Sequence, residues 1–399
     1  MTSDEAEVVV IGGGAAGIAA ARRLHDGGVD CLLLEARPRL GGRAWTIDDR
    51  RSASPLDLGC GWLHSADRNP WLKIAEAQGC SIDRTPPPWS RPSAPIGFPL
   101  SEQAAFRDAL VAFHQRASLA EGEPDRAAVT LLDPDCRWSG LINAVSTYVS
   151  GAELDRVSVR DFARYDDSGI NWRIVQGYGA AIAAHGADLR VMFGCKVGQI
   201  DHSGRRLRVE TSNGATTADA IIVTLPSTVL AEDELLFRPA LPEKVEAAAG
   251  LPLGLADKLF LSLAGAEEFD KDTRLFGRTD RVGTGAYHFR PFGRPQIEAY
   301  FGGTLAAELE AGGESAFVEF AVAELVALFG SAFARRVEPL HSYRWVSIRS
   351  PEAPTPTRYR ENRTAVSRSP RRWTIASSSP ARRARCTISP PHTAPISRA

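Results

Sequence analysis

The chain has 399 residues, which is enough for two domains or for one large domain with an insertion. Hydrophobic residues make up 44% and charged residues 24%, a globular composition that excludes a disordered or fibrous chain as a whole. The formal net charge of -1 gives the molecule no bulk electrostatic attraction for nucleic acid, so we expect no nucleic-acid partner.

Cellular location and metal binding can also be addressed from composition. No run of about 18 consecutive apolar residues occurs, so we expect no membrane partner. The first residues, MTSDEAE, are acidic, whereas a secretory signal begins with basic residues. The six cysteines form no CxxC pair and no His/Cys cluster, which argues against a zinc site and a disulfide framework. These features predict a cytoplasmic protein with no metal site.

The first 35 residues follow the order strand, glycine-rich turn, helix, strand. Residues 7–11, EVVVI, are an apolar run suited to a buried parallel strand. A helix is predicted from Ala15 to about His25, where two following glycines end it. Residues 29–35, VDCLLLE, form a second strand that ends in an acid. This order is typical of the start of an α/β nucleotide-binding fold.

Three glycines in this turn fill the pattern G-x-G-x-x-G. Gly12 permits a tight turn, Gly14 lets a pyrophosphate approach the backbone, and Gly17 lets the helix pack on the strand. The helix N-terminus supplies free N–H groups to the phosphates. Glu35 can accept hydrogen bonds from an adenosine ribose, and it would repel a 2′-phosphate. The pattern predicts dinucleotide binding; a glycine-rich turn without a ligand is the alternative.

The segment after the second strand separates FAD from NAD. Residues 36–45, ARPRLGGRAW, resemble the E-A-x-x-x-x-G-G-R segment of the flavin-containing amine oxidase family, which has a glutathione-reductase-like FAD fold. The resemblance implies that Gly42 and Arg43 lie against the FAD pyrophosphate and flavin, where a guanidinium suits a diphosphate. A surface arginine after a loop is the alternative. The same resemblance adds three residues to the cofactor-binding set, namely Ala16, Ala36 and Arg37.

Residues 57–64, DLGCGWLH, resemble the family element G-A-x-W-I-H that runs past the flavin. The resemblance places four residues there: Gly59, Cys60, Gly61 and Trp62. His64 matches a histidine common in the polyamine-oxidising branch and is expected near the substrate amine. A histidine that is simply hydrogen-bonded near the surface is the alternative.

Further family marks lie in the second half of the chain. Val197 matches a valine whose backbone contacts the adenine, although it is also an ordinary strand residue. The Asn213-Gly214 pair predicts a hairpin, and the strand after it ends at a T-x-P element that contains Pro226.

Two later residues match positions near the flavin in the family. Lys258 matches the lysine that holds a water beside flavin N5, where an ammonium can assist proton handling or oxygen reduction. An ordinary strand-edge lysine is the alternative, but a lysine inside the apolar run LADKLFLSL is costly to bury without a role. Trp345 matches a tryptophan near the flavin and is the last residue of the resemblance.

The expected fold class is α/β: a glutathione-reductase-like, Rossmann-type FAD-binding domain with an inserted mixed α/β substrate domain. The FAD-binding domain is expected to comprise residues 1–80, 172–258 and 335–345. The substrate domain is expected to comprise residues 81–171 and 259–334. It should contain an amphipathic helix over 101–119, with Ser101 as the N-cap, and a second helix over 315–329.

Residues 346–399 differ in composition from the rest of the chain. They carry 11 Arg and 2 Glu, a charge of +9, so the remaining residues carry -10. They include 8 Pro and 9 Ser and no Gly, Leu or Phe, which predicts disorder. The permitted codons, read from the third base of each, allow LFFAGEACS and other motifs that the family has here. We therefore expect a one-base frame change near Trp345; a genuine basic tail is the alternative.

The resemblance implies oxidation of an amine to an imine, with hydride transfer to flavin N5 and reoxidation by O2 to H2O2. The expected cofactor is FAD, bound noncovalently because the shifted codons give serine where covalent members have cysteine. The expected partners are a small amine and O2, and activity is expected to be impaired by the altered tail. Two alternatives remain: an inactive flavoprotein fragment, and a desaturase or other oxidoreductase with the same FAD fold.

Overall fold

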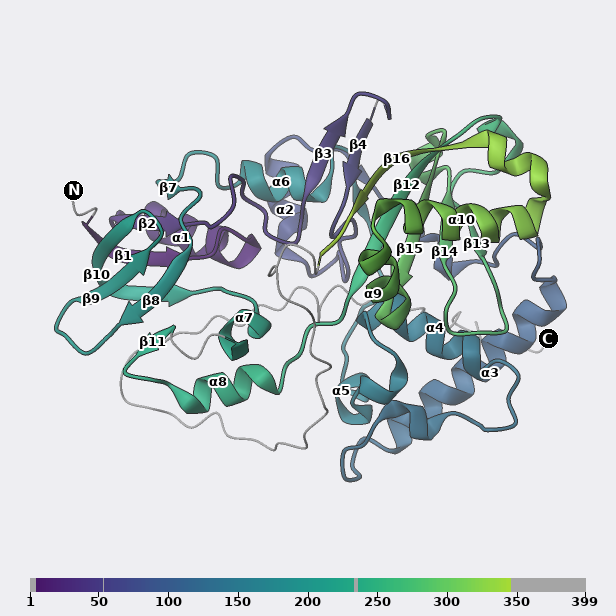
Figure 1. Cartoon of the computed structure of the whole chain (residues 1–399), viewed down its shortest axis with the longest axis horizontal. Coiled ribbons are helices and arrows are strands. Elements are labelled where there is room, and N and C mark those ends of the chain that lie inside the picture. Colours follow the sequence, from purple (N-terminus) through teal and green to yellow (C-terminus); the bar gives the residue numbers. More distant parts are fainter. Residues whose placement is uncertain (1–4, 53, 233–235, 346–399) are drawn as a thin grey trace, which may run out of the picture.

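The computed structural model describes residues 5–52, 54–232 and 236–345. Two sheets organise this part of the chain, a seven-stranded sheet at the left of Figure 1 and a five-stranded sheet at the right. The fold is mixed α/β, which confirms the predicted class. The predictions for residues 346–399, disorder and a shifted reading frame, lie outside the described residues.

The seven-stranded sheet contains the predicted nucleotide-binding start of the chain. Its strands are β1 (Glu5–Ile11), β2 (Cys31–Leu34), β7 (Val191–Met192), β8 (Val197–Asp201), β9 (Leu207–Thr211), β10 (Gly214–Val223) and β11 (Phe237–Arg238). In space they run β11-β8-β9-β10-β1-β2-β7. The central pairs β10-β1 and β1-β2 are parallel, whereas β9 is antiparallel to both of its neighbours. The strands that follow each other at the chain start therefore lie inside the sheet, with β2 next to the edge strand β7.

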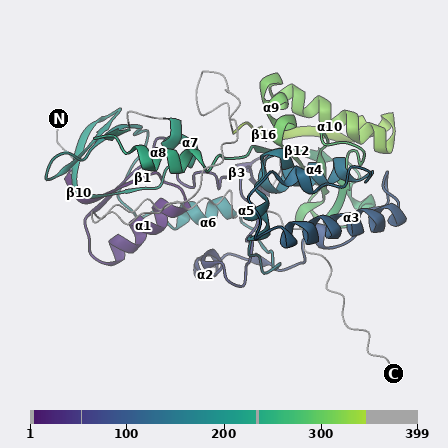
Figure 2. The same cartoon turned by 90° about the horizontal axis from the view of Figure 1, so that it is seen from below.

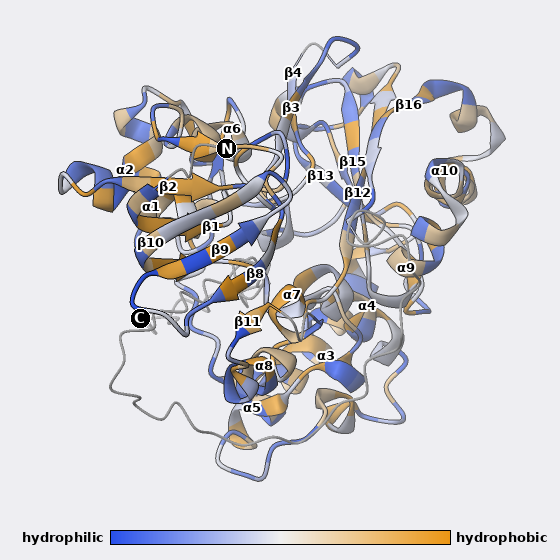
Figure 3. Ribbon diagram, turned by 60° about the vertical axis from the view of Figure 1, so that its left-hand side comes forward, coloured by the Kyte–Doolittle hydropathy of each residue, from blue (hydrophilic) through white to orange (hydrophobic). Residues whose placement is uncertain are grey.

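Helices cover both faces of this sheet, which explains the continuous apolar run in β1. Val10 packs towards α1 (Ala15–Asp26) and α6 (Tyr178–Ala184), while Val9 and Ile11 pack on the other face with residues of α7 (Ser227–Glu232) and α8 (Pro242–Ala249). Figure 3 shows β1 and β2 as hydrophobic strands. A strand buried on both faces cannot alternate apolar and polar residues.

The five-stranded sheet is entirely antiparallel. Its strands are β12 (Ala256–Leu263), β13 (Thr273–Phe276), β14 (Ala286–Phe289), β15 (Gln296–Gly302) and β16 (Val337–Tyr343), in the spatial order β13-β14-β15-β12-β16. Helices α9 (Gly303–Gly312) and α10 (Glu314–Phe329) cover the face that carries Leu259 and Leu261. Lys258 and Phe260 alternate with these leucines and so belong to the opposite face.

Helices α3 (Leu100–Leu119), α4 (Ser139–Ser150) and α5 (Val159–Ala163) share a core with Phe276 and Ala286 of that opposite face. Seen from below, α9 and α10 lie to one side and α3 and α4 to the other (Figure 2). The remaining elements join the two halves and are β3 (Thr46–Asp49), β4 (Ser54–Asp57), α2 (Pro70–Ala77), β5 (Ile82–Asp83) and β6 (Arg173–Ile174).

Most local predictions match these elements. The predicted helices over 15–25 and 315–329 are α1 and α10, and Thr211 pairs with Gly214 in the predicted hairpin. The N-cap prediction for Ser101 is wrong, because α3 begins at Leu100 with Pro99 at the N-cap position. Pro99 has φ -56° and ψ 150°, so the chain enters the helix one residue earlier than the hydroxyl pattern indicated.

The domain boundaries stay a prediction, but strand pairing bears on two of them. Residues 337–343, expected with the FAD-binding domain, form β16 and pair with β12 in the five-stranded sheet. The expected boundary after residue 258 falls inside β12. The chain therefore passes from one sheet to the other between α8 and β12.

Candidate active site

The predicted glycine-rich turn lies between β1 and α1 and needs glycine for two different reasons. Gly12 has φ +106°, a conformation that L side chains rarely adopt. A Cβ atom on Gly17 would lie 1.8 Å from the carbonyl oxygen of Gly12. The hydroxyl of Thr224, at the end of β10, donates to the carbonyl oxygens of Ile11 and Gly12 and so holds the turn against the sheet.

The first turn of α1 is open to a ligand. Gly14 is the N-cap and makes no side-chain capping hydrogen bond, so no side chain satisfies the helix N-terminus. Ala15 and Ala16 border the adjoining cavity. A Cβ atom on Gly42 would lie 3.0 Å from the Cα atom of Gly14, so the two predicted loops touch each other. This arrangement is a ready-made site for an anionic group.

Glu35 is buried at the end of β2 and already binds backbone. Its Oε2 accepts a hydrogen bond from the N–H of Gly13 at 2.6 Å, and its Oε1 accepts from the N–H of Arg37 at 2.8 Å. Each carboxylate oxygen has a second lone pair for a ligand hydroxyl. The acid therefore shapes the turn as well as bordering the cavity.

One large cavity of about 1270 Å³ joins most of the predicted site residues. The predicted residues that line it are Gly12, Gly14, Ala16, Glu35, Ala36, Arg37, Gly42, Arg43, Cys60, Trp62, His64, Val197, Pro226 and Trp345. Those that do not are Gly17, Gly59, Gly61 and Lys258. The cavity therefore runs from the glycine-rich turn to the aromatic residues around His64, and its volume suits a ligand as large as a dinucleotide.

His64 has a partner that the sequence did not indicate. Its Nδ1 lies 2.6 Å from Oδ1 of Asn171, which stands 107 residues later in the chain. Burial lowers the pKa of His64 below its ordinary value, against smaller opposing effects of Asn171 and Asp167. Next to it, the rings of Trp62 and Trp89 meet edge to face at 4.5 Å. The cavity end near His64 thus combines a neutral imidazole with aromatic walls.

Trp345 ends the described part of the chain beside the Gly59 backbone. A Cβ atom on Gly59 would lie 1.8 Å from the carbonyl oxygen of Arg43 and 3.0 Å from Cζ2 of Trp345, so glycine allows both groups to pack against this backbone. Trp345 also meets Tyr343 edge to face at 4.7 Å, and Tyr343 meets Trp45 in the same way. These aromatic contacts fix one wall of the cavity.

Lys258 lies behind the cavity wall rather than on it. Its Nζ donates to the carbonyl oxygen of Asp57 at 2.9 Å and forms an ion pair with Oε1 of Glu298 at 2.7 Å. A Cβ atom on Gly61 would lie 3.4 Å from this ammonium, so the lysine adjoins the segment whose residues Cys60 and Trp62 line the cavity. Two of the three ammonium N–H bonds are thereby assigned to protein acceptors.

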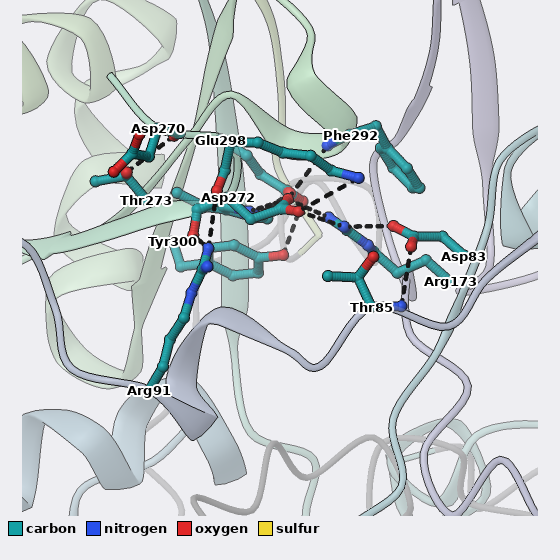
Figure 4. Close-up of polar contacts among 12 residues, drawn as sticks. Asp83, Thr85, Arg91, Arg173, Asp270, Asp272, Thr273, Phe292, Glu298 and Tyr300 are labelled. Atoms are coloured by element: carbon teal, nitrogen blue, oxygen red, sulfur yellow. Dashed lines mark hydrogen bonds and ion pairs between the residues drawn. The ribbon is translucent and has the colours of Figure 1, made fainter. Parts of the chain in front are cut away.

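A buried network of charges gathers around Arg173 and Asp272 (Figure 4), and Glu298 connects it to Lys258. Arg173 forms two hydrogen bonds to Asp272 at 2.9 and 3.0 Å and one to Asp83 at 2.6 Å. Burial alone would raise the pKa of Asp272, but hydrogen bonds from His288 and Arg173 hold it well below its usual range. Sequence reasoning missed this network, although isolated charges in the apolar runs AYHF and QIEAYF signal His288 and Glu298.

The cavity fits a flavin dinucleotide in three respects. It has an uncapped helix N-terminus, a glycine turn that no Cβ could occupy, and a cationic Arg43 beside it. Within the described ranges, no group of three or more His, Cys, Asp and Glu residues could hold a metal ion. No helix in the same ranges is long and apolar enough to cross a membrane.

The sequence model described as flavin containing amine oxidoreductase matches residues 15–100 and 123–387 of this chain. The chain belongs to this family. Membership makes it a flavin-containing oxidoreductase. The family match extends to residue 387, whereas the family motifs named in the sequence analysis end at Trp345.

Individual relatives agree with the family. Polyamine oxidase 2 of Arabidopsis thaliana is 28% identical over 365 residues, which cover 82% of this chain and 73% of that protein. Lysine-specific histone demethylase 2 of Homo sapiens is 27% identical over 286 residues, covering 64% of this chain and 34% of that protein.

Solved structures of amine oxidases share the fold of this family member. Cyclohexylamine oxidase from Brevibacterium oxydans IH-35A superposes with a TM-score of 0.64 at 20% identity, covering 86% of this chain and 85% of that one. Putrescine oxidase bound to putrescine gives a TM-score of 0.65 at 15% identity, covering 85% of this chain and 84% of that one. At these identities the likeness shows a common fold and nothing more about substrate.

Proposed function

We propose that the chain is an FAD-dependent amine oxidase that converts a small amine to an imine, with O2 as the final electron acceptor. One observation carries the proposal: a single cavity connects the glycine-rich turn of α1 with the aromatic residues around His64. When bound, FAD would supply the hydride acceptor, and reoxidation by O2 would yield H2O2. The imine would then hydrolyse in water.

At the nucleotide end, backbone groups and charges hold the proposed cofactor. The open N-terminus of α1 at Gly14 and the guanidinium of Arg43 would face the diphosphate. Glu35 would accept from the ribose, because each of its oxygens has a lone pair beyond its backbone bond. Val197 lines the cavity where the adenine would lie. We propose that these contacts hold FAD noncovalently.

At the reaction end, the chain supplies orientation and a dry surrounding. Trp62 and Trp345 line the cavity and would exclude water from the reacting carbon. His64 would bind the substrate nitrogen with Nε2, because its Nδ1 faces Asn171. Lys258 does not line the cavity, so it would assist proton handling by holding a water with the N–H bond that neither Asp57 nor Glu298 accepts.

Polyamines are the first substrates to test, because the relatives include polyamine oxidases from two plants. The test is the visible absorption spectrum of the purified full chain before and after adding FAD and washing, followed by an assay of amine-dependent H2O2. A retained flavin band that acid precipitation releases into the supernatant, with H2O2 formed from a polyamine, supports the proposal. A colourless protein contradicts it and favours an inactive fragment. A flavin band without H2O2 from any amine favours another flavin-dependent oxidoreductase.

A further inference from the structure

Strand pairing alone places Lys258 close to Glu298. Lys258 stands in β12 between β15 and β16, opposite Tyr300 on one side and Tyr343 on the other. Glu298 stands two residues before Tyr300 and therefore lies diagonally across from Lys258 on the same face of the sheet. Long side chains reach such diagonal neighbours. The 2.7 Å ion pair is thus built into the strand register.

Glu298 is a buried carboxylate whose two oxygens both have partners. Oε1 accepts from the Tyr300 hydroxyl at 2.8 Å in addition to facing Lys258, and Oε2 lies 3.7 Å from Nδ1 of His288. Burial alone would raise the pKa of Glu298, but Lys258 and His288 outweigh it and hold the pKa well below its usual range. The residue therefore remains an anion next to the ammonium.

A chain of contacts braces Glu298 from the side away from Lys258. His288 stands directly opposite Glu298 in the pairing of β14 with β15, and its Nε2 lies 2.9 Å from Oδ1 of Asp272. Asp272 is held by Arg173, whose guanidinium lies 4.7 Å from the ring centroid of Trp62. Figure 4 shows Glu298, Asp272 and Arg173 close together at this place. Contacts thus lead from the tryptophan in the cavity wall to the carboxylate behind it.

We propose that Glu298 is a positioning residue for Lys258, and that His288 holds Glu298 in place. Glu298 does not line the large cavity, so its effect on a ligand there must pass through its neighbours, and its shortest side-chain contact is the one to Lys258. With Asp57 as the second acceptor, the carboxylate fixes the direction of the one remaining ammonium N–H. This inference rests on the role proposed above for Lys258.

The first test reports on the lysine side chain and needs no flavin. The chain contains five lysines, so [13C]lysine labelling gives few signals, and the signal lost in Lys258→Met identifies Lys258. We expect two separate Hε resonances for Lys258 in the wild type, because a fixed ammonium has inequivalent neighbours. They should merge in Glu298→Gln and remain separate in Glu338→Gln, a matched control on the exposed part of β16. Merged resonances in the wild type, or separate ones in Glu298→Gln, would overturn the proposal.

Glu298→Asp provides a variant that keeps the buried charge if the glutamine variant fails to fold. Shortening the side chain by one methylene withdraws the carboxylate from Nζ, so the two Hε resonances should move towards each other. Unchanged resonances in this variant would also count against the proposal.

The second test is a double-mutant cycle in stopped-flow experiments on the flavin-loaded protein. Glu298→Gln should slow the same half-reaction as Lys258→Met, by about tenfold, and leave the KM for the amine within about twofold. The double variant should be no slower than Lys258→Met, because Glu298 acts only through the lysine. A double variant slowed by the product of both factors would show that Glu298 acts independently. If Lys258→Met reacts as fast as the wild type, the proposed role of the lysine is wrong. The NMR test of the Lys258 Hε resonances still decides whether Glu298 positions the lysine.

Discussion

The Nδ1 atom of His64 lies 2.6 Å from Oδ1 of Asn171, while Nδ2 of Asn171 donates to the carbonyl oxygen of Gly169 at 3.1 Å. Because the amide nitrogen is committed to that carbonyl, the amide oxygen must face the imidazole. The neutral ring then carries its proton on Nδ1 and leaves a lone pair on Nε2. Asn171 therefore sets the tautomer of a residue that lines the cavity.

Removing this acceptor should weaken amine oxidation. We expect Asn171→Ala to lower kcat/KM for the amine roughly tenfold, and His64→Ala to lower it about 100-fold. The double variant should be no worse than His64→Ala, since Asn171 acts through the ring. Asn143→Ala is the matched control, because Asn143 accepts from the N–H of Leu154 and does not line the cavity. Steady-state kinetics check this, and additive losses would contradict it.

His64 should also make stability depend on pH. Burial lowers its pKa in the folded chain, so the unfolded chain takes up the proton first, near the ordinary value of 6.5. The free energy of unfolding should therefore fall as the pH drops below 6.5 and through the folded pKa, with no contribution from His64 above 6.5. His64→Gln lacks this component, so urea unfolding at about pH 8 and pH 5 should show a smaller loss than in the wild type. Parallel losses in the two proteins would show that His64 titrates normally.

Close backbone contact at Gly17 predicts a severe effect of a single methyl group. A Cβ atom there would lie 1.8 Å from the Gly12 carbonyl, so Gly17→Ala must displace either α1 or the turn. We expect a loss of about 3 kcal/mol or more in the free energy of unfolding, together with loss of flavin retention. Gly122→Ala is the control, because no atom lies within 4 Å of its added Cβ. It should change stability by less than about 0.5 kcal/mol. Thermal unfolding and FAD titration measure both effects, and a stable, flavin-binding Gly17→Ala would refute the packing argument.

The buried Arg173 should be far more important for stability than an exposed arginine. Arg173→Met removes the buried guanidinium that Asp83 and Asp272 share, so we expect a loss of about 3–5 kcal/mol. Arg278→Ala removes an exposed ion pair with Asp280 and should cost less than about 1 kcal/mol. Denaturant unfolding compares the two variants. Similar losses would mean that water reaches the Arg173 network.

Much of the nucleotide end of the site could be predicted from sequence, because its parts are close in the chain. Gly12, Gly14 and Gly17 lie on one turn, and Glu35 follows on the next strand, so spacing alone brings them together. Lys258 is indicated by the family resemblance and by the cost of burying an isolated lysine, yet its place next to Gly61 and outside the cavity lining could not be foreseen. That position depends on how β12 packs against residues 57–62, which continue from β4, although Asp57 comes 201 residues before Lys258 in the chain.

The amino-acid sequence determined the local elements of this protein: apolar runs gave the buried strands, and glycines gave the turn and the end of α1. Tertiary structure decided the polar partners. Asn171 reaches His64 across 107 residues and Arg173 reaches Asp272 across 99. Hydrophobic periodicity is written into every short segment, whereas a hydrogen bond between distant residues exists only after the sheets have packed. A sequence can show that an isolated charge in an apolar strand needs a partner, and only the packed chain shows which residue it is.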